Sequence, residues 1–145
     1  SDLASGFDAL NDNYPYVHGL YPREVDHQWS SPEAGFLLRR TDQDRLLLTL
    51  SIPNQVFQRL ASPSDLRLSV FSQGCIGSEF QPVAGRQTFE IPVICPLTTE
   101  PVVLEIAVRL NAHMPFVHQI DSDGRRLGFL FESARLVNSK SLAKS

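Results

Sequence analysis

The side chains best suited to contacting a ligand are concentrated near the N-terminus, between positions 14 and 29. They are aromatic rings and imidazoles: Tyr14, Tyr16, His18, Tyr21, His27 and Trp29. Aromatic faces beside hydrogen-bonding groups suit a saccharide, because sugar C–H groups stack on the ring while polar neighbours bind the hydroxyl groups. We therefore predict that Tyr21, His27 and Trp29 form a ligand-binding site. Trp29 has an alternative role, because large aromatic residues often fill a domain core.

Motifs of catalysis and of metal binding are missing from the sequence. It contains no Gly-x-Ser-x-Gly or Ser-x-x-Lys motif and no glycine-rich phosphate loop. Cys75 and Cys95 lack the close spacing of zinc ligands, and the four histidines are not spaced as ligands on one helix or strand face. The Asp-Ser-Asp-Gly run at residues 121–124 is typical of a turn, and the two arginines after it disfavour calcium. We predict a non-catalytic protein with no metal site and no cofactor.

The elements that position these residues are predicted to be β-strands, because period-two alternation of apolar and polar residues dominates the chain. The alternating segments are residues 36–40, 46–52, 66–70, 88–93, 102–110 and 127–137. In the last segment the alternation changes phase, which predicts a β-bulge near Glu132 or Ser133. Pro92 lies inside a segment, which indicates an edge strand or a strand break. Residues 54–61 favour a short helical turn.

This pattern predicts an all-β fold, a two-sheet antiparallel β-sandwich with either jelly-roll or immunoglobulin-like topology. The chain of 145 residues fits one domain, which we place at residues 14–137. Residues 1–13 are predicted to be a flexible N-terminal segment and residues 138–145 a flexible C-terminal tail, because both are polar and lack alternation.

Charge and composition narrow the range of partners. The chain carries 13 basic and 16 acidic residues, a net charge of −3, which argues against nucleic acid as a partner. No apolar run approaches the roughly 20 residues that span a bilayer. We interpret Cys75 and Cys95 as free thiols, with one disulfide as the alternative. The sequence also shows no secretory signal. These two observations favour a cytoplasmic location.

Two short motifs occur in the same order as in a known type of domain. The first is GLYPRE at residues 19–24 followed by Trp29, and the second is DGRRLG at residues 123–128, leading into the last strand. Together they resemble an accessory, carbohydrate-binding-module-like β-sandwich domain found beside bacterial glycosyltransferases and surface-polysaccharide biosynthesis enzymes. The resemblance covers about residues 19–137 and implies a non-catalytic, glycan-binding accessory module. The implied partners are an oligo- or polysaccharide and an adjacent catalytic domain.

The motif residues also have a structural interpretation. Glu24, Asp123 and Arg125 are predicted to form a charged network between the first strand and the last, because a buried carboxylate needs a partner such as arginine. Gly128 is expected to meet a need for close packing or for a positive φ. The alternative function is therefore a structural or protein–protein interaction module that packs on a partner domain.

Overall fold

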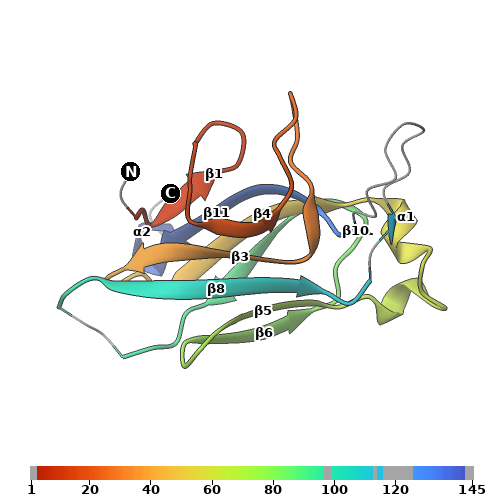
Figure 1. Ribbon diagram of the computed structural model, residues 1–145. Helices are drawn as coiled ribbons and strands as arrows, with labels where there is room; N and C mark the ends of the chain where they lie inside the picture. The colour runs from red at the N-terminus through yellow and green to blue at the C-terminus, as the bar shows by residue number, and fades with distance from the viewer. Residues whose placement is uncertain (1–2, 97–98, 113, 116–125, 143–145) are drawn as a thin grey trace.

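The protein consists of two antiparallel β-sheets packed face to face (Figure 1). The computed structural model describes residues 3–96, 99–112, 114–115 and 126–142. The four-stranded sheet contains, in spatial order, β1 (Gly6–Asp8), β11 (Leu130–Val137), β4 (Arg45–Ile52) and β7 (Gly85–Pro92). The five-stranded sheet contains β2 (Val17–Leu20), β3 (Ser30–Arg40), β8 (Val102–Leu110), β5 (Leu68–Ser72) and β6 (Ile76–Phe80). The predicted all-β sandwich is therefore confirmed.

The remaining elements are short. They are the strand pair β9 (Met114–Pro115) and β10 (Arg126–Leu127), the helices α1 (Asn54–Phe57) and α2 (Ser139–Leu142), and the 3-10 helix η1 (Pro63–Asp65). In α1 the side chains of Val56 and Phe57 are buried against the core. This confirms the helical turn predicted near residue 54, where apolar residues share one helical face.

The strand order is that of a jelly roll. The first strand, β1, pairs with the last, β11, so that Phe7 lies opposite Ala134. In the other sheet β3 pairs with β8, so that Phe36 lies opposite Ile106. Neighbouring strands thus come from distant parts of the chain, as in double-sheet jelly rolls. In an immunoglobulin-like sandwich the first two strands are neighbours instead.

Alternation along the strands places one face of each sheet in a shared core. The buried aliphatic side chains include Leu46, Leu48, Leu50, Ile52, Leu104, Ile106, Val108 and Leu110. Aromatic rings add contacts between the sheets. Phe7 stacks on Phe131 with ring centroids 5.3 Å apart, and Phe36 of the opposite sheet lies 5.6 Å from Phe7. Burying one such ring stabilises a fold by about 1.5–3 kcal/mol.

Residues 6–8 belong to the sandwich, although the sequence predicts a flexible segment over residues 1–13. Gly6, Phe7 and Asp8 pair with β11 as an edge strand. Phe7 is only 2% exposed, and Tyr14 stacks on it with ring centroids 4.6 Å apart. A strand of three residues has one buried side chain, which is too short a pattern for alternation to reveal. The domain therefore begins before residue 14.

Of the C-terminal segment, which the sequence predicts to be a flexible tail at residues 138–145, the structure describes residues 138–142. Residues Ser139–Leu142 form α2, and the carboxylate of Asp44 accepts hydrogen bonds from the Ser139 amide (2.7 Å) and hydroxyl (2.5 Å). The hydroxyl bond and then the amide bond lower the pKa of Asp44. This helix cap joins residues 95 positions apart, so no local pattern indicated it.

Two irregular features follow the sequence prediction. The pairing of β11 with β4 shifts register between Phe131 and Ser133, which confirms the predicted β-bulge. Pro92 lies opposite Arg45 at the end of β7, and β7 is an edge strand of the four-stranded sheet. An edge strand tolerates proline because its missing N–H is not needed by a second neighbour.

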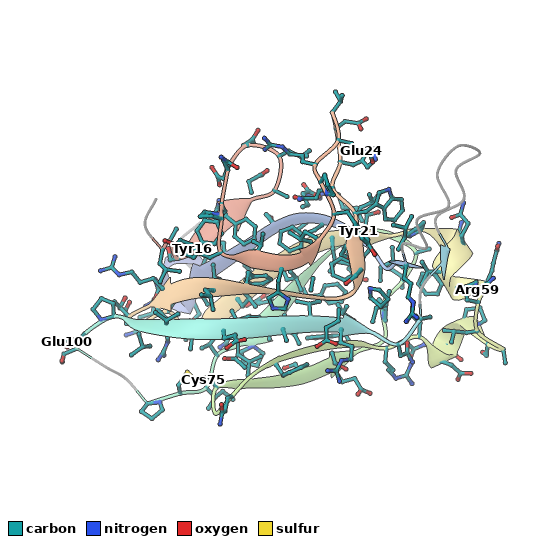
Figure 2. The ribbon with its side chains drawn as sticks, viewed as in Figure 1. Tyr16, Tyr21, Glu24, Arg59, Cys75 and Glu100 are labelled. Carbon is teal, nitrogen blue, oxygen red and sulfur yellow. A yellow bond between two sulfur atoms is a disulfide. The ribbon has the colours of Figure 1, made fainter. Side chains whose placement is uncertain are left out.

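Cys75 and Cys95 form a disulfide, so their interpretation as free thiols is wrong. Their Cα atoms are 4.7 Å apart, and the amide of Ile94 donates to the carbonyl of Cys75 (2.8 Å). Cys75 lies in the turn between β5 and β6, whereas Cys95 follows β7 (Figure 2). The bond therefore connects the five-stranded sheet to a segment leaving the other sheet. The two residues are brought together by elements of different sheets, which their spacing did not reveal.

Candidate functional site

A hairpin between β2 and β3 carries the residues that the sequence predicts to bind a ligand. The amide of Tyr21 donates to the carbonyl of Trp29, and the amide of Glu24 donates to the carbonyl of His27, both at 2.9 Å. These bonds extend the pairing of β2 with β3 outward. We call residues 21–29 the hairpin arm; it projects away from the two sheets (Figure 1).

A side-chain and a backbone hydrogen bond hold the hairpin arm against the rest of the domain. The guanidinium of Arg23 donates to the carbonyl of Leu10 (2.7 Å), in the loop after β1. The backbone carbonyl of Gln28 accepts from the amide of Phe131 (2.9 Å), while the Gln28 side-chain amide donates within the arm to the backbone carbonyl of Tyr21 (2.9 Å). The arm is therefore fixed both to the N-terminal loop and to β11.

The hydroxyl group of Tyr21 is engaged by the backbone of β10. It donates to the carbonyl oxygen of Arg126 (2.9 Å) and accepts from the amide of the same residue (3.1 Å). The side chain is half buried at the base of the hairpin arm (Figure 2). Tyr21 thus joins the arm, which belongs to the first sequence motif, to a strand formed by the second.

His27 lies between two carboxylates near the tip of the hairpin arm. Its Nδ1 is 2.6 Å from Oδ1 of Asp26, and its Nε2 contacts the carboxylate of Glu24. The hydrogen bond to Asp26, with the charge of Glu24 acting in the same direction, raises the pKa of His27 against partial burial. The same bond lowers the pKa of Asp26. Because both ring nitrogens are engaged, the imidazole suits hydrogen bonding better than general-base catalysis.

A hollow of about 410 Å³ lies between the hairpin arm, the loop after β1 and the four-stranded sheet. Its polar lining consists of Asp8, Asn11, Asp26, His27, Ser51 and Glu132, and its apolar lining of Leu10, Leu130 and Phe131. We call it the arm hollow. Arg86 fixes the Glu132 carboxylate through two hydrogen bonds of 2.7 and 2.9 Å, which lower the pKa of Glu132. The arm hollow therefore presents an ionised, oriented acceptor beside apolar surface.

The structure brings the three predicted ligand-binding residues onto one hairpin but gives them different surroundings. His27 lines the arm hollow, whereas Tyr21 and Trp29 do not. Trp29 is half buried, lies edge-on to His27 with ring centroids 6.3 Å apart, and forms a β-bridge with Leu130. It is neither a core residue nor an open stacking platform.

Of the three residues in the predicted charged network, the structure describes only Glu24. Glu24 pairs with His27, on the same hairpin arm. Asp123 and Arg125 lie outside the described residues. The network between the first strand and the last therefore stays a prediction.

Gly128 confirms the expectation of close packing. A Cβ atom at this position would lie 2.9 Å from the carbonyl oxygen of Ser31 and 3.0 Å from the Cα atom of Pro32. Its φ is not positive, so close approach of the backbone explains the glycine and a left-handed conformation does not.

The sequence prediction missed the residues that complete the arm hollow opposite His27. Asp8 and Asn11 come from a segment interpreted as flexible, and Glu132 comes from the β-bulge. The only local signal was the polar run at residues 11–13, which is typical of a turn. Asp8 shapes this loop, because its carboxylate accepts a hydrogen bond from the amide of Leu10 (3.0 Å).

Within the part of the chain that the structure describes, no group of three or more His, Cys, Asp or Glu side chains could hold a metal ion. The helices in the same part are too short or too polar to cross a membrane. No protein-family model, curated protein or solved structure matches this chain. The fold and the site together define a jelly-roll domain with a polar hollow beside a hairpin arm.

Proposed function

We propose that this domain is a non-catalytic, glycan-binding module and that the saccharide lies in the arm hollow. The observation that carries the proposal is the lining of this hollow, where apolar side chains stand beside carboxylates, an amide and an imidazole. A sugar ring has the same two-sided character, with C–H faces for apolar contact and hydroxyl groups for hydrogen bonds. Ionised carboxylates accept from hydroxyl groups, and the side chain of Asn11 both donates and accepts.

Within this proposal His27 is the central contact, and its neighbours orient it. The imidazole is 36% exposed, and Glu24 and Asp26 hold the ring on either side. Each carboxylate retains acceptor sites beyond its bond to the histidine, so Asp26 can accept from a sugar hydroxyl group while the exposed part of the imidazole ring packs against the sugar. Tyr21 and Trp29 position the hairpin arm through backbone pairing, and they contribute less to the ligand.

The adjacent partner is a catalytic domain of bacterial polysaccharide biosynthesis, in line with the two motifs that resemble glycosyltransferase-associated domains. An open hollow with few convergent polar groups fits weak binding of one short saccharide segment. Attachment to an enzyme raises the effective concentration of the polysaccharide, so weak binding suffices for retention.

A glycan array probed with the whole chain tests the proposal, followed by titration of each hit monitored through Trp29, the only tryptophan. We expect saturable binding that His27→Ala and Asn11→Ala both reduce about tenfold, His27→Ala through lost ring contact and Asn11→Ala through one to two lost hydrogen bonds. Asn54→Ala is the matched control, because Asn54 is exposed on α1 and does not line the arm hollow. Absence of binding to every glycan overturns the proposal.

One observation favours the second candidate, a structural or protein–protein interaction module. Val25 is fully exposed at the tip of the hairpin arm, between two acidic residues. An apolar side chain at a projecting tip suits insertion into a partner domain. Concentration-dependent self-association that Val25→Asp abolishes, together with a negative glycan array, would support this function over the first.

A further inference from the structure

A second hollow, of about 580 Å³, lies on the outer face of the five-stranded sheet. Its lining includes Phe71, Gln73, Val103, Glu105 and Ala107. We call it the sheet hollow. Its size falls within the range of sites that bind small ligands. None of its residues lines the arm hollow, which lies against the other sheet.

The sheet hollow arises because β8 is longer than its neighbour β5. The ladder between these strands ends where Phe71 lies opposite Ala107, whereas β8 begins at Val102 (Figure 1). Over residues 102–106 the described strands flank β8 on one side only, through β3. A strand edge carries backbone N–H and C=O groups that lack a ladder partner, so it offers both donors and acceptors to a bound molecule.

Phe71 forms an aromatic wall of the sheet hollow, and a cation fixes its orientation. The ring is 38% exposed, and the guanidinium carbon of Arg109 lies 5.3 Å from the ring centroid. Arg109 is held in turn by Glu33, with an Nη2–Oε1 distance of 3.1 Å. Arg109 covers one side of the ring, which leaves the side that faces the hollow for stacking.

From this arrangement we propose that the sheet hollow is a second saccharide-binding site, which takes another segment of the same polysaccharide. The inference rests on the proposed function, because it assigns the same ligand class to a different face. Sugar C–H groups would stack on Phe71 above Ala107, while Glu105, Gln73 and the open edge of β8 bind hydroxyl groups.

The scale of the exposed apolar surface favours a saccharide over a protein in the sheet hollow. Two large apolar side chains, Phe71 and Val103, are exposed there, and charged residues surround them on β3, β6 and β8. A stable protein interface needs roughly 1,000 Å² or more of buried surface with an apolar centre. A single sugar ring needs only one aromatic face and a few polar groups.

Two sites on opposite sheets would make one domain bivalent for a long chain. A polysaccharide that reaches both hollows, or that links two copies of the domain, is retained much longer than a short fragment, because the second contact forms at high effective concentration. A hexasaccharide should therefore bind with two sites per protein, and a polymer of the same sugar should cross-link the protein into turbid aggregates.

The test is ¹H–¹⁵N NMR mapping of the whole chain, titrated with cellohexaose, maltohexaose and chitohexaose. We expect a binding hexasaccharide to shift amide signals around His27 and, separately, around Phe71 and Glu105. Phe71→Ala should lower affinity at the sheet hollow about tenfold and leave the arm hollow unchanged. Glu105→Gln, which keeps the shape of the side chain, should have a smaller effect at the same hollow.

The outcomes separate this inference from the proposed function. Shifts confined to the arm hollow overturn the second site and leave the proposed function standing, whereas shifts in neither hollow with any of the three probes count against both. Val83→Ala is the control, because Val83 is an exposed apolar residue outside both hollows. Occupation of the β8 edge by an alternating Thr-Val octapeptide, but by none of the sugars, would identify a peptide site and overturn the inference.

Discussion

The hydroxyl group of Tyr21 donates to the carbonyl oxygen of Arg126 and accepts from its amide, at 2.9 and 3.1 Å. Residues 105 positions apart are thereby joined through one side chain. Tyr21→Phe removes both bonds and keeps the ring. We expect a loss of about 0.5–1.5 kcal/mol in the free energy of unfolding, measured by urea denaturation, with unchanged glycan affinity. Unchanged stability with lost affinity would instead make Tyr21 a ligand contact.

The pKa of His27 makes the hairpin arm sensitive to pH. Its hydrogen bond to Asp26, aided by Glu24, raises this pKa in the folded protein, so the imidazolium stabilises the arm. That contribution is fully present below the unfolded value of about 6.5 and is lost as the pH rises through the folded-state pKa. The pKa of Asp26 is lowered, so its contribution is present above the unfolded carboxylate value and is lost as the pH falls through its folded-state pKa.

NMR titration of the His27 ring protons measures this effect. We expect a midpoint above that of a histidine in an unfolded peptide, and Asp26→Asn should move it downward by removing the main cause. A midpoint that Asp26→Asn leaves in place would contradict the assigned hydrogen bond.

The buried face of a strand could be predicted where the alternating pattern was long and local. Leu46, Leu48 and Leu50 alternate over a full strand, so their shared buried face followed from side-chain direction alone. The change of phase in the last strand fixed the bulge, because one extra residue is the simplest way to restore alternation. These features depend on neighbours only a few residues away.

Features set by distant contacts could not be predicted in the same way. The burial of Phe7 depends on β11, and the disulfide of Cys75 depends on how the two sheets stack. At the site, residue type and spacing identified His27, but the exposure of Trp29 is decided by its bridge to Leu130. Asp8 was not predicted as a site residue, because no alternation or motif in the surrounding sequence marks it.

The disulfide between Cys75 and Cys95 should contribute substantially to stability. It closes a loop with a sequence separation of 20, for which the loss of unfolded-chain entropy is about 3 kcal/mol. We expect the Cys75→Ser, Cys95→Ser double variant to unfold at a lower temperature, and dithiothreitol to lower the melting temperature of the wild type but not of the variant. Two titratable thiols in the denatured, unreduced protein would contradict the bond.

The disulfide also affects the prediction of a cellular location. A cytoplasmic location was predicted in part from free thiols, and the disulfide removes that support, because such bonds persist mainly in oxidising compartments. The location itself stays a prediction. Alkylation of thiols in intact cells of the source organism, before lysis, would show whether Cys75 and Cys95 are oxidised where the protein resides.

Gly128 should tolerate an added side chain much less well than Gly77 of β6, although neither glycine has a positive φ. A methyl group there would meet the backbone of Ser31 and Pro32 at 2.9 and 3.0 Å, and backbone atoms cannot move aside as a flexible side chain can. We expect Gly128→Ala to cost about 1–3 kcal/mol, as overpacking does, and to displace the start of β3, from which the hairpin arm projects. Gly77→Ala is the matched control, because nothing lies within 4 Å of its Cβ position and its φ is not positive. Denaturation curves that shift equally for both variants would show that the contact with β3 does not explain Gly128.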